Sequence, residues 1–369
     1  MRVGLTLYGS LDGRSGGFRY DRKLVAGLRA AGDTVEVVEL PWRSYPRGLL
    51  DALSPSVRRR LAVDVDVMLQ DELAHPSLVG TNPGLPYPTV SVVHHLRASE
   101  PRRLRPLYRA VERRYLSSVD AAVCNSHATA RSVEETGGPP ADRTVVAPPA
   151  GDRFDPDLDA ATVEDRAHEG PLRAVFVGNL EPRKGLDTLV DAVERVEDPL
   201  RVTAVGRPTD DRYVRHVEAR VADSDRVRLT EQLSDADLAD VLRRSHVLAV
   251  PSRYEGFGIV YPEGMSFGLP AIATTAGGAD EVVTDGETGF LVDPDDPGGV
   301  ARALTTLARD RDRLARMGRS ARRRYETHPD WEETVGRVRA LLAEVADAPT
   351  ATEPESGVSS EPPAEGEVA

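Results

Sequence analysis

Two glutamates, Glu255 and Glu263, lie eight positions apart in the stretch YEGFGIVYPEG. Gly256 and Gly258 disfavour a helix around Glu255, whereas Pro262 suits a helix's first turn. The pattern therefore predicts Glu255 in a loop and Glu263 at a helix start, both facing one cleft. The alternative is a helix-dipole role for Glu263 and a solvated loop position for Glu255, worth about 0.3–1 kcal/mol each.

Two neighbouring cations, Arg183 and Lys184, stand in VFVGNLEPRKGLDTLVDA, just after an expected strand and just before an expected helix. A planar guanidinium fork beside a compact ammonium can hold a diphosphate. Among the 47 basic residues, only Lys23 and Lys184 are lysines. A lysine kept in this loop suggests that a point charge is needed there, with chance as the alternative explanation.

Two glycines, Gly16 and Gly17, stand in the loop YGSLDGRSGGFRYDRKL, which runs into an expected helix. They let the backbone approach a ligand, and the helix N-terminus favours an anion such as phosphate. A flexible turn is the alternative. The spacing departs from GxGxxG, which weakens a nicotinamide interpretation.

In VSVVHHLRASE, alternation along the strand lets only one of His94 and His95 face a cleft, and a structural histidine is the commoner case.

Short apolar runs alternate with helical patterns along the chain, which predicts parallel sheets covered on both faces. This alternation of strands and helices is interrupted at the polar stretch DLDAATVEDRAHEG and then resumes. We therefore expect an α/β protein with two Rossmann-like domains facing across a cleft. Beyond about residue 345 the chain is rich in Pro, Glu and Ser, which predicts a disordered acidic tail. The expected divisions are residues 1–155, a linker at 156–170, a second domain at 171–328, a helix at 329–345 packing back on the first domain, and the tail at 346–369.

Length and composition fit this organisation. The chain has 369 residues, 40% of them hydrophobic, enough for two cores. We expect a cytoplasmic protein because no stretch is long and apolar enough to span a bilayer. Cys124, the only cysteine, excludes an internal disulfide. The net charge of −13 argues against nucleic acid as a partner and, with so few lysines, suggests a halophilic source.

The segment from Pro251 to Val292 resembles the donor-site signature of the retaining family 4 glycosyltransferases of GT-B fold, with glutamates separated by seven residues. Five stretches before this segment also occur in the family's order: SGGF, VVHHL, CNSHAT, VAPPAGDRFDP and VFVGNLEPRKG. The resemblance therefore covers roughly residues 1 to 340. It implies a retaining hexosyltransferase of carbohydrate biosynthesis that takes a nucleotide-diphosphate-sugar as co-substrate.

The resemblance also implies roles for single residues. In the second domain, Glu255 would contact the donor sugar, Gly256, Phe257 and Gly258 would bring the backbone to sugar or phosphate, and Glu263 would bind the ribose hydroxyls. Arg183 and Lys184 would stabilise the departing diphosphate, with Gly16 and Gly17 approaching it from the first domain. His94 would lie beside the transferred sugar.

The family usually works without a metal, and no DxD-type constellation occurs here in a matching context, so we expect no metal and no cofactor. Retention is thought to proceed on one face of the sugar, so Glu255 is not a glycosidase nucleophile. Asn179 stands where the family often has arginine and supplies no cation. A non-catalytic partner that binds nucleotide sugar remains the alternative; a nucleotide-sugar epimerase or phosphorylase fits YEGFGIVYPEG poorly.

The acceptor side is less distinct. Asp71, Glu72 and His75 follow a strand of the half that resembles an acceptor-binding domain, where they either contact the acceptor or cap neighbouring helices. The acceptor itself, a glycan, a lipid-linked sugar or a small molecule, is open. The arginines of SVRRRLAVD and PRRLRPLYRAVERRY form either a solvated helix face or a surface for peripheral association with the inner membrane.

Overall fold

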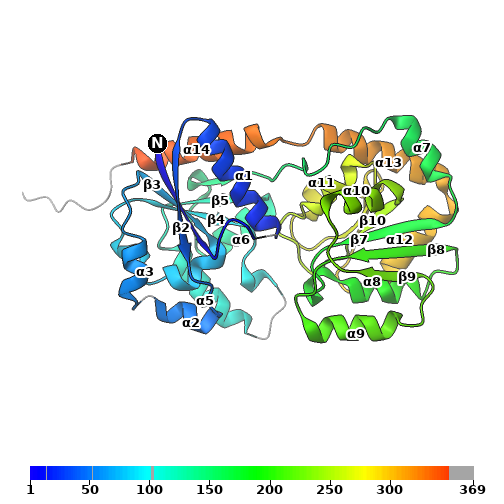
Figure 1. Cartoon of the computed structure of the whole chain (residues 1–369), viewed down its shortest axis with the longest axis horizontal. Coiled ribbons are helices and arrows are strands. Elements are labelled where there is room, and N and C mark those ends of the chain that lie inside the picture. The colour runs from blue at the N-terminus through cyan, green and yellow to red at the C-terminus, as the bar shows by residue number, and fades with distance from the viewer. Residues whose placement is uncertain (14, 52, 101–103, 349–369) are drawn as a thin grey trace, which may run out of the picture.

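The computed structural model of the protein describes all residues except 14, 52, 101–103 and 349–369. Figure 1 shows two lobes side by side, each built on its own sheet. The predicted α/β class with two Rossmann-like domains is confirmed. Nearly all of the predicted disordered tail lies outside the described residues.

The first lobe contains a six-stranded sheet in the order β2-β1-β3-β4-β5-β6, and all of its paired strands run parallel. Parallel strands covered on both faces need apolar residues throughout, and the third and fourth strands are buried along their whole length. The strands are β1 (Arg2–Tyr8), β2 (Thr34–Leu40), β3 (Val67–Asp71), β4 (Thr89–Val93), β5 (Ala121–Cys124) and β6 (Thr144–Val146).

The second lobe repeats this plan with a parallel sheet in the order β12-β11-β10-β7-β8-β9. In each sheet the order of the strands along the chain reverses at one point, between β1 and β3 in the first lobe and between β10 and β7 in the second. Ligands of such sheets bind at this point, at the carboxyl ends of the strands. The strands are β7 (Leu172–Val177), β8 (Leu200–Val205), β9 (Val227–Thr230), β10 (Val247–Ala249), β11 (Ala271–Thr274) and β12 (Gly289–Val292).

Helices cover both sheets. Those of the first lobe are α1 (Gly16–Ala30), α2 (Tyr45–Asp51), α3 (Pro55–Arg60), α4 (His75–Leu78), α5 (Arg105–Leu116), α6 (His127–Glu135) and α14 (Trp331–Ala346). Those of the second lobe are α7 (Ala160–Ala167), α8 (Leu186–Val193), α9 (Asp211–Val221), α10 (Asp235–Arg244), α11 (Val260–Ser266), α12 (Pro297–Arg309) and α13 (Arg311–Glu326). Short 3₁₀ helices include η1 (Glu72–Ala74), η3 (Arg97–Ser99), η5 (Pro182–Lys184) and η6 (Ala279–Glu281).

Helix α14 returns to the first lobe and lies along α1 (Figure 1). Its apolar face, which includes the fully buried Val338 and Leu342, joins the core formed by α1 and the first sheet. Within the segment expected to be a linker, residues 160–167 form α7, which packs on α13. We find no helix among the described residues with the length and apolar character needed to cross a bilayer.

Candidate active site between the two lobes

The loops at the carboxyl ends of the two sheets meet between the lobes. The approach is closest at Gly256, where an added β-carbon would lie 2.0 Å from the carbonyl oxygen of His94. Ser126 Oγ donates to the Gly256 carbonyl across the same boundary at 2.6 Å. Gly16, the first residue of α1, lies beside Ile259 of the second lobe. The positive end of the α1 dipole therefore points into the interlobe region.

A buried ion pair joins the two predicted donor-site elements of the second lobe. Lys184 Nζ lies 2.5 Å from Glu255 Oε2, and Arg183 Nη1 lies 3.6 Å from Glu255 Oε1. Burial opposes ionisation of Glu255, but the two cations outweigh it and lower its pKa to about 2. Burial also lowers the pKa of Lys184, and Glu255 counters that effect. Arg183 also pairs with Glu181 at 2.8 Å and lies 3.8 Å from Glu100, so carboxylates hold both cations in place.

Backbone contacts hold these two loops in register. Gly185 has φ 69°, and an added β-carbon there would lie 2.0 Å from the carbonyl oxygen of Pro251. Only glycine fits both constraints. The Arg253 amide donates to the Arg183 carbonyl at 2.7 Å. The loop after β7 and the loop after β10 are therefore interlocked, which fixes the position of the cations relative to Glu255.

The second glutamate, Glu263, lies in the first turn of α11 and forms its ion pairs with two other arginines. Arg19 Nη1 of α1 lies 2.7 Å from Glu263 Oε1, and Arg153 Nη1 lies 3.6 Å from Oε2. Burial raises the pKa of Glu263, and the two arginines act against this rise. Arg19 also contacts Asp152 at 3.0 Å. Glu263 is thus held at the boundary between α1 and α11.

The remaining donor-site predictions lie around this pair of glutamates. Phe257 is part of the second-lobe core, and Gly258 has φ 84° with the Tyr261 ring beside it. Asn179 is half-buried in the loop that follows β7. Gly17 lies against the His94 ring, where an added β-carbon would come within 3.1 Å of Cδ2.

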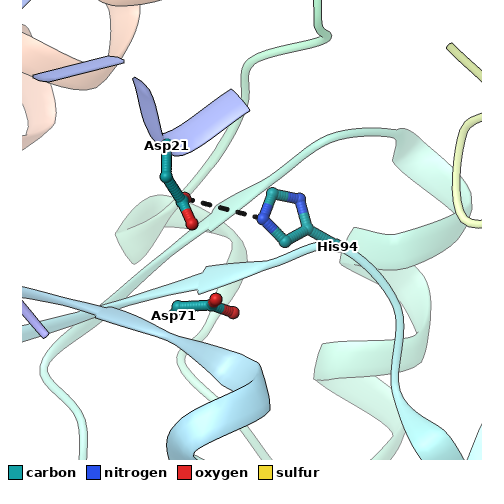
Figure 2. A group of neighbouring side chains, drawn as sticks. All are labelled: Asp21, Asp71 and His94. Carbon is teal, nitrogen blue, oxygen red and sulfur yellow. Dashed lines mark ion pairs between the residues drawn. The ribbon is translucent and has the colours of Figure 1, made fainter. Parts of the chain in front are cut away.

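His94 follows β4 and faces a buried acidic cluster (Figure 2). Its Nε2 lies 3.7 Å from Asp21 Oδ1 of α1, and its backbone amide donates to Glu72 at 2.9 Å. Asp21, Asp71 and His94 each place one polar atom within 4.8 Å of the others. Burial alone would lower the pKa of His94, but Asp21, Glu72 and Asp71 raise it to about 9. These carboxylates therefore favour the protonated form of His94.

Asp71, Glu72 and His75 are buried and bonded within the first lobe. Asp71 accepts from the Leu73 amide at 3.0 Å and so caps η1. His75 Nδ1 contacts the Glu72 carbonyl, and its Nε2 contacts the Tyr45 hydroxyl. Burial lowers the pKa of His75 to about 4, so this ring is neutral. Only the Asp71 contact is a helix cap, and contact of these three residues with an acceptor stays a prediction.

Sequence reasoning missed several residues that the structure brings to the lobe boundary. Arg19 and Arg153 pair with Glu263, Asp21 faces His94, and Glu281 accepts from two backbone amides at the N-terminus of α6. Each of these contacts joins segments far apart in the chain. The one local signal was the position of Arg19 two residues after the glycine pair.

Two family models match the chain, one in each lobe. The model described as Glycosyltransferase Family 4 matches residues 14–152, and the model described as Glycosyl transferases group 1 matches residues 161–324. Solved structures share the fold. Sucrose-phosphate synthase from Thermosynechococcus elongatus has 21% identity and a TM-score of 0.79 over 93% of this chain and 98% of that one. Anabaena HepE, solved with UDP and glucose, has 18% identity and a TM-score of 0.76 over 93% and 100%.

Curated relatives carry the name D-inositol 3-phosphate glycosyltransferase. The protein of Nocardia farcinica is 34% identical over 62% of this chain and 54% of its own length. Two further Corynebacterium relatives are matched over 59% and 64% of their lengths, so the chain spans little more than half of these proteins. The protein of Corynebacterium urealyticum is 30% identical over 75% of this chain and 68% of its own length. The chain therefore belongs to family 4 of the glycosyltransferases, the glycosyl transferases group 1, and has their GT-B fold.

Proposed function

We propose that this chain transfers a sugar from a nucleotide-diphosphate-sugar to an acceptor hydroxyl, with retention of configuration and without a metal ion. The observation that carries this proposal is the buried ion pair of Lys184 and Glu255, with Arg183 beside it, at the lobe boundary. Carboxylates hold both cations at this boundary, and in the proposed complex the diphosphate binds to the same two cations. Glu255 holds the Lys184 ammonium in place before the donor binds.

The charges suit the bond that must break. When the bond between the anomeric carbon and the diphosphate oxygen breaks, its electron pair stays on that oxygen. Arg183 and Lys184 stabilise the resulting charge without rearranging, which lowers the barrier. The acceptor oxygen bonds to the anomeric carbon from the face that the diphosphate leaves, and its proton passes to a phosphate oxygen. This route requires no basic side chain.

The nucleotide end has its own place at the boundary of α1 and α11. Glu263 is buried and pairs with Arg19 and Arg153. In the proposed complex it accepts hydrogen bonds from the ribose hydroxyls, and the N-terminus of α1 faces the phosphates. Binding of the donor therefore joins the two lobes, as substrate-induced closure does in many transferases.

The test is turnover by the pure protein. UDP-, GDP- and ADP-sugars are first screened by thermal shift, because a ligand of the folded state raises the melting temperature. The donor that shifts the protein is then incubated with acceptors in the presence of EDTA, and the anomeric proton of the product is followed by NMR. We expect a retained anomer with EDTA present; an inverted anomer or loss of turnover with EDTA contradicts the proposal. Donor binding without turnover favours the non-catalytic alternative. That alternative is considered because Asn179 supplies no cation where the family often has arginine.

The first lobe carries an apolar and basic face on α2, α3 and α5. Helices α2 and α5 touch through the rings of Tyr45 and Tyr108, 4.9 Å apart. No acidic side chain of these three helices is exposed, because Asp51 and Glu112 are both buried. Most large hydrophobic side chains exposed in the described chain lie on or beside these helices, namely Leu50, Leu53, Leu104 and Leu107, whereas Trp42 packs against Tyr8 and Phe18. The exposed arginines on or beside these helices are Arg43, Arg47, Arg58, Arg59, Arg60, Arg105, Arg109, Arg113 and Arg114.

We propose that this face rests on an anionic bilayer and that the acceptor is lipid-linked. Cationic and apolar side chains that alternate on one surface suit the headgroup region, and a basic face is unusual in a chain of net charge −13. The name of the curated relatives points instead to a phosphorylated inositol as acceptor. Transfer to inositol phosphate but not to lipid-linked sugars would contradict the lipid proposal.

Flotation with liposomes tests the bilayer contact. We expect binding to anionic vesicles and not to zwitterionic ones, with loss of binding in the double variant Arg58→Glu/Arg59→Glu. Arg215→Glu, an exposed arginine on α9 of the second lobe, is the control for charge change. Equal binding by all variants, or no binding of the wild type at low salt, contradicts the proposal.

A further inference from the structure

One buried carboxylate of the first lobe has no partner that accounts for it. Asp21 of α1 is 0% exposed, and neither of its carboxylate oxygens forms a hydrogen bond within the described chain. An unpaired buried carboxylate costs several kcal/mol, so such a group is paired or protonated. The cation that faces it is His94, whose Nε2 is likewise buried and without a hydrogen bond.

The other acidic groups around His94 already have roles. Asp71, at the end of β3, caps η1, and Glu72 of η1 accepts from the His94 backbone amide. Tyr20 of α1 packs edge-on against the His94 ring at 5.3 Å between centroids. Asp71 and Glu72 thus have other partners that explain their positions, whereas the position of Asp21 is explained by the imidazole alone.

The ring orientation gives this contact a direction. Figure 2 shows Nε2 turned toward Asp21, with the second ring nitrogen on the far side of the ring. Gly256, the residue after Glu255, packs against the backbone of His94. Asn125 Nδ2 donates to the same His94 carbonyl at 2.8 Å, which fixes the backbone. One edge of the ring thus faces α1, and the other nitrogen lies on the opposite edge.

We propose that Asp21 is a positioning residue for His94: its carboxylate forms an ion pair with the ring at Nε2, keeps the ring as an imidazolium and leaves Nδ1–H to donate into the interlobe site. This inference rests on the proposed function. His94 then supplies a fixed hydrogen-bond donor to an oxygen of the donor sugar or diphosphate, and it does not act as a base. The proposal gives Asp21 a specific role in a helix whose neighbouring buried residues serve the core.

The first test needs no substrate. The pKa of His94 is measured by NMR titration of the histidine ring protons, with His94→Gln to assign the signal. We expect a value near 9 in the wild type, from the contacts with Asp21, Glu72 and Asp71 described above. Asp21→Asn keeps the side-chain shape and removes the charge, so the pKa should fall by at least about one unit, a tenfold loss in proton affinity. Asp142→Asn, an exposed aspartate of the same lobe, should leave it unchanged.

Activity and metal content complete the test. In the wild type, kcat should fall as pH rises through about 9, where the imidazolium loses its proton; in Asp21→Asn this fall should come at lower pH, with the donor KM little changed. If the wild-type His94 titrates at or below an ordinary histidine pKa, or is unmoved in Asp21→Asn, the proposal is wrong even if the enzyme is active. Stoichiometric metal that is lost in Asp21→Asn overturns it as well, because the cluster then binds an ion. Absence of turnover with every donor contradicts the proposed function alone, since the titration is still readable.

Discussion

At the scale of single residues, the two lysines of this chain occupy opposite environments. Lys184 is held in the interlobe site by Glu255, whereas Lys23 pairs with Asp152 in a more exposed position. The same substitution at each position therefore separates a role in the site from a general effect of losing a lysine.

We expect Lys184→Ala to lower kcat by at least about 100-fold while the fold survives, because a fixed charge at the leaving group is lost. Lys23→Ala should retain turnover close to that of the wild type. Steady-state kinetics measures both effects, and circular dichroism confirms folding. Turnover of Lys184→Ala within a few-fold of the wild type would remove Lys184 from the mechanism.

Glu255 makes stability depend on pH in the acid range. Its pKa is lowered to about 2, so its ionised form stabilises the native state above its ordinary pKa, and this contribution is lost as pH falls toward 2. The shift corresponds to on the order of 3 kcal/mol. Urea unfolding of Glu255→Gln should therefore differ most from the wild type above about pH 5. A difference that stays constant down to pH 2 would mean that the Glu255 charge is not the stabilising feature.

At the scale of elements, the loop after β10 meets the loop after β4 at a point where no side chain fits. Gly256→Ala would place a β-carbon 2.0 Å from the His94 carbonyl, so the lobes must separate by about 1 Å or more. We expect turnover to fall by about 100-fold, because a displacement of this size disrupts alignment of the reacting groups.

The matched control for this substitution is Gly336→Ala in α14, where an added β-carbon meets open space. There alanine should raise the melting temperature, because glycine costs roughly 0.5–1 kcal/mol inside a helix. If Gly256→Ala keeps full activity, the lobes do not need this close approach during turnover.

Elements were predictable because their signals are local. The helix expected after Gly16 and Gly17 is α1, and the helix expected after Arg183 and Lys184 is α8. The interlobe contacts were not predictable, since Arg19 meets Glu263 across 244 positions of sequence. A glycine pair, a proline in a first turn and a lysine in a loop are visible in sequence; the partner of a charged side chain is fixed only when distant loops meet.

At the scale of the whole molecule, a carboxylate at a helix end is one of the contacts that join the two lobes. Glu281 of the second lobe accepts from the His127 and Ala128 amides of α6 at 2.8 and 2.7 Å. A carboxylate at a helix N-terminus satisfies amides that have no partner within the helix.

We expect Glu281→Ala to favour a more open arrangement, seen as a larger radius of gyration in X-ray scattering of the free protein. Donor should reduce the difference, because binding favours closure. Asp280→Ala, at the exposed neighbouring position, is the control and should scatter like the wild type. Identical scattering of all three proteins would show that Glu281 does not control the opening of the lobes.

The return of α14 to the first lobe has a mechanical consequence. The chain passes from the first lobe to the second between Ala147, in the first core, and Phe154, in the second, and it passes back between α13 and α14. The two crossings define an axis about which the lobes can rotate relative to each other. A single linker would leave their relative orientation free. A protease cut in the first crossing should accordingly leave two fragments that stay associated, because α14 remains anchored in the first core.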